Sequence, residues 1–173
     1  MNNISITNGE AIEELGKMPT ESVDLIIADP PYNLGKDYGK SSDLKSKEAY
    51  LQFSRNWLSE AKRVLKSNGT IYIFMGVRFI SYLYLIIEEE LKMNFNSWIC
   101  WHYTQGIGKT NGFSPRHDDI LMFSKGKKPF FDLDAVRVPQ KFYRKKITCE
   151  VQIPVMFGNS PTYIIPIRIE IRI

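Results

Sequence analysis

Four consecutive residues, Asp29, Pro30, Pro31 and Tyr32, combine groups that suit the recognition of an amine on a flat ring. A carboxylate and a neighbouring backbone carbonyl both accept hydrogen bonds, so together they can hold the two N–H bonds of one NH₂ group. Two prolines in a row have fixed φ angles and donate no hydrogen bonds, which makes a stiff turn with exposed carbonyl oxygens. The tyrosine supplies a ring that stacks on a heterocycle. This string therefore predicts a binding site for an exocyclic aromatic amine.

The same groups suit a transfer reaction at that amine. An aromatic amine is a poor nucleophile because its lone pair is delocalised into the ring. Two acceptors on its N–H bonds favour a more pyramidal nitrogen, placed for in-line attack on an electrophilic methyl group. Asp29 is also expected to receive the released proton. The alternative is that the prolines only end a strand, while Asp29 makes a turn and Tyr32 packs; the complete string favours function.

A buried strand must position this turn, because the apolar run VDLIIA (residues 23–28) leads directly into Asp29. Continuous apolar runs are typical of strands in parallel sheets. Strands and helices alternate along the chain, which predicts an α/β fold with a mostly parallel sheet and a site at the carboxyl ends of its strands. The other expected strands are 4–6, 70–76, 97–103, 118–126 and 135–143, and the expected helices are 10–17, 47–66 and 78–92.

Positive charge is concentrated in one region of this 173-residue chain, which carries a net charge of +4. Residues 124–146 hold eight Lys or Arg against two Asp, a local +6, so the remainder is −2 (4 minus 6). The alternatives are a solvated charged face and a surface that contacts nucleic-acid phosphates. The residues expected to make phosphate contacts are Lys125, Lys127, Lys128, Lys141, Arg144, Lys145 and Lys146.

Composition argues against several other classes of protein. Cys100 and Cys149 are too few for a disulfide framework, and no Cys/His cluster has the spacing of metal ligands. The N-terminus lacks the pattern of a signal peptide, and the most apolar helical stretch, residues 79–87, is too short to span a bilayer. We expect a cytoplasmic protein without a membrane partner.

The stretch ADPPYNLGKDYG (residues 28–39) resembles the catalytic motif of DNA amino-methyltransferases that use S-adenosylmethionine. The aspartate form of the motif points to adenine N6 rather than cytosine N4. Three longer stretches also resemble the beta group, in which the catalytic motif precedes the cofactor-binding motif. They are NGEAIEELGKMPTESVDLIIADPPYN, RVLKSNGTIYIF and WICWHYTQGIGKTNGFSPRHDDILMFSKGKK, and the resemblance extends to residue 146.

This resemblance implies a Rossmann-like methyltransferase sheet with helices on both faces, acting on a base flipped out of double-stranded DNA. It implies that Asp29 and the Pro30 carbonyl hold the adenine amine, that Pro31 stiffens the turn and that Tyr32 stacks on the base. Asp29 is also expected to contact S-adenosylmethionine. A cognate restriction endonuclease is a further expected partner.

The chain departs from the family after residue 146. Beta-group enzymes continue with a target-recognition segment, a lysine-proline motif of the type HPTQKP and a Gly-rich DPFxGxG turn, and these do not follow here. We therefore expect a catalytic part at 1–146 and an atypical tail at 147–173, in which IIPIRIEIRI predicts a half-buried strand. The sheet would lack its cofactor-binding half and leave an open edge for the tail, a second chain or a homodimer to cover.

Two other functions are compatible with these residues. One is a truncated or frameshifted methyltransferase fragment that binds DNA without catalysis, or half of a split enzyme. The other is methylation of an amide or an RNA base, because the same chemistry serves any planar NH₂ group.

Overall fold

The protein divides into two units, Met1–Phe131 and Asp132–Ile173. The computed structural model describes residues 4–35, 45–104, 108–114, 116–138, 147–155 and 163–171. The four residues of the candidate site lie in the first unit.

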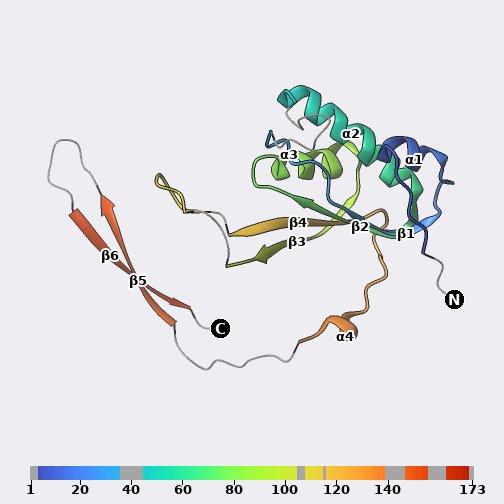
Figure 1. Cartoon of the computed structure of the whole chain (residues 1–173). Coiled ribbons are helices and arrows are strands. Elements are labelled where there is room, and N and C mark those ends of the chain that lie inside the picture. Colours follow the sequence, from blue (N-terminus) through green and yellow to red (C-terminus); the bar gives the residue numbers. More distant parts are fainter. Residues whose placement is uncertain are drawn as a thin grey trace. The chain divides into compact units, whose positions relative to one another are not determined.

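The first unit is built on a four-stranded mixed sheet in the order β1-β2-β4-β3 (Figure 1). The strands are β1 (Val23–Ala28), β2 (Leu65–Met75), β3 (Asn94–His102) and β4 (His117–Ser124). β1 and β2 pair in parallel, whereas β4 is antiparallel to both β2 and β3. Three strands therefore run in one direction, as the expected mostly parallel sheet requires. β4 is the exception: the described residues between β3 and β4 form no crossover helix, so the chain returns antiparallel.

The helices of this unit lie on one face of the sheet (Figure 1). They are α1 (Ala11–Lys17), α2 (Lys47–Val64) and α3 (Ile80–Leu85), which continues as the π-helical turn η1 (Ile86–Glu90). Among the described residues, no helix is long and apolar enough to cross a membrane. The core between helices and sheet includes Tyr50, Trp57, Leu58, Leu65, Ile71, Ile73, Met75, Phe79, Leu83, Ile87, Leu121 and Phe123.

The opposite face of the sheet is open at its edge strand. The side chains of Leu25 and Ile27 on β1 are 51% and 67% exposed. The expected α/β methyltransferase sheet is confirmed, and in the described residues its helices cover one face. β1 pairs only with β2 in this sheet, so the expected open edge is present in the part of the chain that the structure describes.

Helix α2 forms as its apolar spacing predicts. The side chain of Ser46 accepts a hydrogen bond from the Ala49 amide at 3.1 Å, which caps the first turn. Tyr50, Trp57, Leu58, Ala61 and Val64 form the buried stripe. The helix ends at Val64, two residues before the expected end, because the buried Leu65 already begins β2.

Two expected strands are wrong. Residues 4–6 form no strand, and Ile4 and Ile6 are 89% and 92% exposed; their alternation is a local pattern that finds no strand to pair with among the described residues. The expected strand at 135–143 begins instead within a short helix, α4 (Leu133–Val136). The Asp132 carboxylate accepts a hydrogen bond from the Ala135 amide at 3.0 Å and caps this turn. Residues 139–143 lie outside the described part.

The second unit contains α4 and an antiparallel pair of strands, β5 (Ile147–Val155) and β6 (Tyr163–Ile171). β6 confirms the strand expected in the tail. It pairs with β5, from Ile147 opposite Ile171 to Val155 opposite Tyr163. The two strands form a sheet of their own.

Candidate active site

The four predicted site residues lie together directly after β1. Asp29 follows Ala28, the last residue of the strand, and its side chain is exposed. Pro31 is exposed as well, whereas Pro30 and Tyr32 are half-buried. The turn thus offers a carboxylate to solvent at the carboxyl end of a parallel strand, where ligands bind in open α/β sheets.

Tyr32 turns its hydroxyl group to Asp29 and its ring to β2. Burial raises the pKa of Tyr32 well above its usual range, and the hydrogen bond to the Asp29 carboxylate and its charge raise this pKa further. The ring lies beside Gly76, where an added Cβ atom would meet Tyr32 Cδ2 at 3.4 Å, an ordinary van der Waals distance. The ring therefore packs beside the backbone that follows β2.

Two further residues from other strands lie near the Tyr32 hydroxyl. The charges of Asp118 and Tyr103 also raise the pKa of Tyr32. Tyr103 follows β3, where its amide donates to the Arg116 carbonyl at 2.9 Å, and Asp118 on β4 pairs with Trp101. The sequence does not predict a role for Asp118, because its proximity to Tyr32 depends on the position of β4 between β2 and β3 in the sheet.

The neighbour of Asp118 points the other way. Asp119 is buried, and its carboxylate accepts a hydrogen bond from Trp98 Nε1 at 2.8 Å and lies 3.7 Å from His117 Nε2. His117 is thus directed to Asp119 and not to the adjacent Asp118, as alternation along a strand requires. These residues support β3 and β4 on the face away from Asp118.

Two buried side chains hold the turn in place. The hydroxyl of Tyr50 on α2 donates to the Pro31 carbonyl at 2.7 Å. Asn33 is fully buried and has a positive φ of 57°. Its amide donates to the Lys45 carbonyl at 3.1 Å, and its Oδ1 accepts from the Lys45 amide at 2.6 Å. The turn is therefore fixed on both sides of Tyr32.

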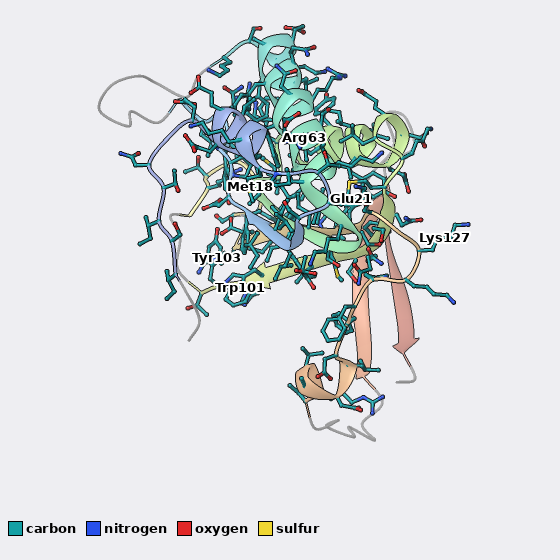
Figure 2. The ribbon with its side chains drawn as sticks, turned by 90° about the vertical axis from the view of Figure 1, so that its right-hand side faces the viewer. Met18, Glu21, Arg63, Trp101, Tyr103 and Lys127 are labelled. Atoms are coloured by element: carbon teal, nitrogen blue, oxygen red, sulfur yellow. The ribbon has the colours of Figure 1, made fainter. Side chains whose placement is uncertain are left out.

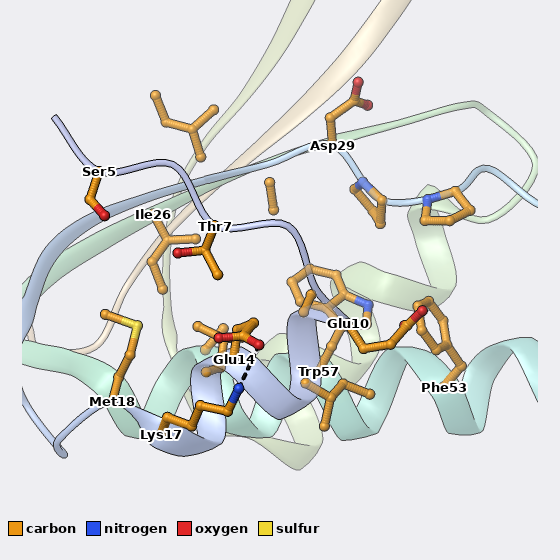
Figure 3. A pocket seen from close by; sticks show the side chains of 18 of the residues that line it. Ser5, Thr7, Glu10, Glu14, Lys17, Met18, Ile26, Asp29, Phe53 and Trp57 are labelled. Carbon is orange, nitrogen blue, oxygen red and sulfur yellow. Dashed lines mark hydrogen bonds and ion pairs between the residues drawn. The ribbon is translucent and has the colours of Figure 1, made fainter.

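A cavity of about 890 Å³ lies beside the turn, between β1, α1 and α2 (Figure 3). Its lining includes the carboxylates of Glu10, Glu14 and Asp29 and the rings of Phe53 and Trp57. Glu14 is already paired with Lys17 at 2.6 Å. The indole Nε1 of Trp57 is buried and has no hydrogen-bond partner in the described structure. The cavity thus has an acidic rim and an apolar floor with one unused donor.

Of the predicted basic residues that the structure describes, Lys125 and Lys127 do not lie at this site. Lys125 follows β4 at the opposite end of the sheet, and its ammonium donates to the Leu65 carbonyl at 2.7 Å and pairs with Glu21 at 3.1 Å. β1 runs from this end of the sheet to Asp29, and its length is about 20 Å. Lys127 lies on the opposite side of the unit from Trp101 and Tyr103 (Figure 2).

The remaining basic residues divide into two groups. Lys127 and Lys128 are exposed. Lys141, Arg144, Lys145 and Lys146 lie outside the described residues.

Fold and site together define a class of protein. A mixed α/β sheet that presents an acid, two prolines and a tyrosine after a parallel strand is typical of amino-methyltransferases. The family model described as DNA methylase, N6_N4_Mtase, matches residues 23–151. The chain therefore belongs to this DNA methylase family.

Individual relatives agree with this assignment. The chain is 63% identical to the type II methyltransferase M.HpaI of Haemophilus parainfluenzae over 135 residues, which are 78% of this chain and 43% of that protein. It is 32% identical to the DNA adenine methyltransferase YhdJ of Escherichia coli (strain K12) over 139 residues, 79% of this chain and 47% of that protein.

A solved structure shares the fold. The cytosine-N4-specific PvuII DNA methyltransferase superimposes with a TM-score of 0.62 at 16% identity, over 74% of this chain and 51% of that one. The chain thus spans less than half the length of M.HpaI and of YhdJ, the two curated relatives named above.

Proposed function

We propose that this chain contributes the acceptor-amine site of a DNA adenine N6-methyltransferase that uses S-adenosylmethionine. The observation that carries the proposal is the position of Asp29, Pro30, Pro31 and Tyr32 at the exposed carboxyl end of β1, where Asp29 raises the pKa of Tyr32. Family membership and the name of the Escherichia coli relative support DNA and adenine as substrate and target.

In this proposal Asp29 and the Pro30 carbonyl accept the two N–H bonds of the adenine amine. A carboxylate has about four lone-pair sites, so Asp29 can accept from the Tyr32 hydroxyl and from the amine together. The Pro31 carbonyl already accepts from Tyr50, and within the described residues no hydrogen bond reaches the Pro30 carbonyl. The ring of Tyr32, backed by Gly76, supplies the stacking surface. Asp29 receives the proton that the amine loses.

The cavity beside Asp29 fits the proposed cofactor in size and charge. Cofactor pockets commonly enclose about 300 to 1,000 Å³, and this cavity measures about 890 Å³. Glu10 and Asp29 supply negative charge for a cationic ligand. S-adenosylmethionine would supply an electrophilic methyl group there, and Asp29 is the residue proposed to contact it.

Partners of the proposed enzyme are double-stranded DNA and a polypeptide that completes the sheet. Lys127 and Lys128, with the predicted basic residues beyond them, are proposed to contact DNA phosphates. The free edge of β1, with Leu25 and Ile27 exposed beside it, supports pairing with a second chain or a second copy. Relatives named type II methyltransferases support a cognate restriction endonuclease.

The proposal is tested by incubating the chain with DNA and methyl-labelled S-adenosylmethionine, followed by nucleoside analysis. We expect label in N6-methyladenine and not in N4-methylcytosine. Asp29→Ala should reduce transfer by roughly two to three orders of magnitude, the typical loss when one group that stabilises developing charge is removed. Asp24→Ala is the matched control, because Asp24 lies at the other end of β1 and pairs with Lys66 at 2.7 Å.

A second candidate function is a fragment or split enzyme, which is consistent with the free edge of β1 and with the share of the relatives' length that the chain covers. Adding the part of M.HpaI outside the matched region distinguishes the two. Label that appears only in the mixture supports a split enzyme. Label from the isolated chain, or calorimetric binding of S-adenosylmethionine to it, contradicts an inactive fragment.

A further inference from the structure

Tyr50 occupies a central position in the core next to the catalytic turn. It lies in the first turn of α2 and is 1% exposed. Its ring packs against Phe79 with centroids 4.5 Å apart and against Phe53 at 6.2 Å. A ring held on two sides leaves its hydroxyl little freedom, so that group is placed by the core and not by the solvent.

The hydroxyl of Tyr50 forms a hydrogen bond with the proline turn. It donates to the Pro31 carbonyl at 2.7 Å and lies 3.6 Å from Met75 Sδ on β2. Because Pro31 belongs to a pair of prolines, the turn has no N–H groups of its own at residues 30 and 31 to satisfy neighbouring carbonyls. The buried phenol and the carbonyl therefore satisfy each other, and leaving either unpaired would be costly.

We propose that Tyr50 is a positioning residue for the acceptor site: its hydroxyl fixes the plane of the peptide bond between Pro31 and Tyr32. This inference rests on the proposed function and deepens it. The Pro31 carbonyl is directed into the core, which leaves the Pro30 carbonyl and the Asp29 carboxylate as the acceptors for the amine. The same peptide plane sets the direction in which the Tyr32 side chain leaves the backbone.

The consequence for Tyr32 is specific. Its ring must lie against Gly76 while its hydroxyl reaches Asp29. Both contacts depend on the orientation of the backbone at residue 32, because a small rotation of the preceding peptide moves the far end of a tyrosine by several times as much. Tyr50 acts on the site through Pro31 and does not touch the amine.

The test compares Tyr50→Phe with Tyr84→Phe. Tyr84 on α3 is a matched control, because its ring also packs against two aromatic rings, those of Phe95 and Phe123. Its hydroxyl donates to Glu88 in η1 at 2.8 Å. The first readout needs no substrate: nitration of Tyr32 by tetranitromethane, followed by mass spectrometry of the peptide. Nitration requires the phenolate, so the Asp29 hydrogen bond protects Tyr32.

We expect Tyr50→Phe to speed nitration of Tyr32 about fivefold, a factor on the order of one lost hydrogen bond, and Tyr84→Phe to leave it unchanged. In methyl transfer, Tyr50→Phe should lower kcat about tenfold with KM for DNA little changed, since misplacement of reacting groups affects the rate. Wild-type nitration rates in Tyr50→Phe, or equal acceleration in both variants, would overturn the inference. If the wild-type chain transfers no methyl group while the nitration result holds, the proposed function fails and the positioning role stands.

Discussion

The side chain of Tyr32 lies beside the carboxylate of Asp29, whose hydrogen bonding and negative charge add to burial in raising the pKa of the tyrosine. Both residues belong to the same turn, so this interaction does not depend on a distant element. It also keeps the tyrosine proton in place, because removing that proton would put a second negative charge beside Asp29. The phenol of Tyr32 therefore stays neutral over the ordinary pH range.

Replacing Asp29 by Asn should lower the pKa of Tyr32 relative to the wild type while leaving it above about 10, since burial still favours the neutral phenol. A raised pKa means that the native state holds this proton more tightly than the unfolded state. Its contribution to stability is therefore complete below about pH 10 and is lost as pH rises beyond that value. Phenolate absorbance during alkaline titration, corrected with Tyr32→Phe, measures the shift. Asp24→Asn should titrate as the wild type does; an unchanged midpoint in Asp29→Asn would contradict the prediction.

Asn33 should be among the most sensitive positions near the site, because three features converge on it. It is fully buried, it has a φ of 57°, and it exchanges two hydrogen bonds with the Lys45 backbone. Asn33→Ala should cost about 3 kcal/mol from lost hydrogen bonds and left-handed strain.

Asn33→Gly separates these two effects. It should cost about 1 kcal/mol less than Asn33→Ala, because glycine relieves the strain only. Urea unfolding measures both variants, and equal losses would show that backbone strain plays no part.

The turn from Asp29 to Tyr32 could be predicted from the sequence because its signal is local. An apolar strand followed directly by Asp29 specifies both the position and the exposure of the carboxylate. The helix from Lys47 was predictable for the same reason, since its apolar stripe and its Ser46 cap lie within a few turns.

What could not be predicted depends on the order of strands in the sheet. Tyr103 and Asp118 approach Tyr32 only because β4 inserts between β2 and β3. The alternation of Ile4 and Ile6 looks like a strand, but a strand needs a partner, and both side chains are exposed. The helical turn in place of the strand expected from residue 135 depends on a single cap, Asp132.

Lys125 and its basic neighbours should behave differently when changed to Ala. Lys125→Ala removes the hydrogen bond to the Leu65 carbonyl and should lower the free energy of unfolding by about 1 kcal/mol. Loss of the ion pair with Glu21 adds little, because the Glu21 side chain is half exposed. Lys127→Ala and Lys128→Ala should leave stability within about 0.5 kcal/mol.

In DNA binding we expect the opposite pattern: Lys127 and Lys128 should contribute, whereas Lys125 should not. If Lys127 or Lys128 contacts a phosphate, its loss should reduce the slope of log K against log salt by about 1. Lys125→Ala should leave this slope unchanged, because its ammonium is engaged within the protein. A reduced slope in Lys125→Ala alone would reverse the assignment.

Trp57 should tolerate one substitution and not another. Its side chain is 6% exposed, yet its Nε1 has no partner among the described residues and it lines the cavity beside β1. Trp57→Phe removes the unsatisfied donor and loses no hydrogen bond, so relief of that penalty should offset part of the lost packing. We expect a loss of about 1 kcal/mol, compared with about 3 to 5 kcal/mol for Trp57→Ala, which empties the site. Thermal unfolding followed by circular dichroism measures both. A loss in Trp57→Phe as large as that in Trp57→Ala would show that the indole N–H is satisfied in solution, by an acceptor placed in the cavity.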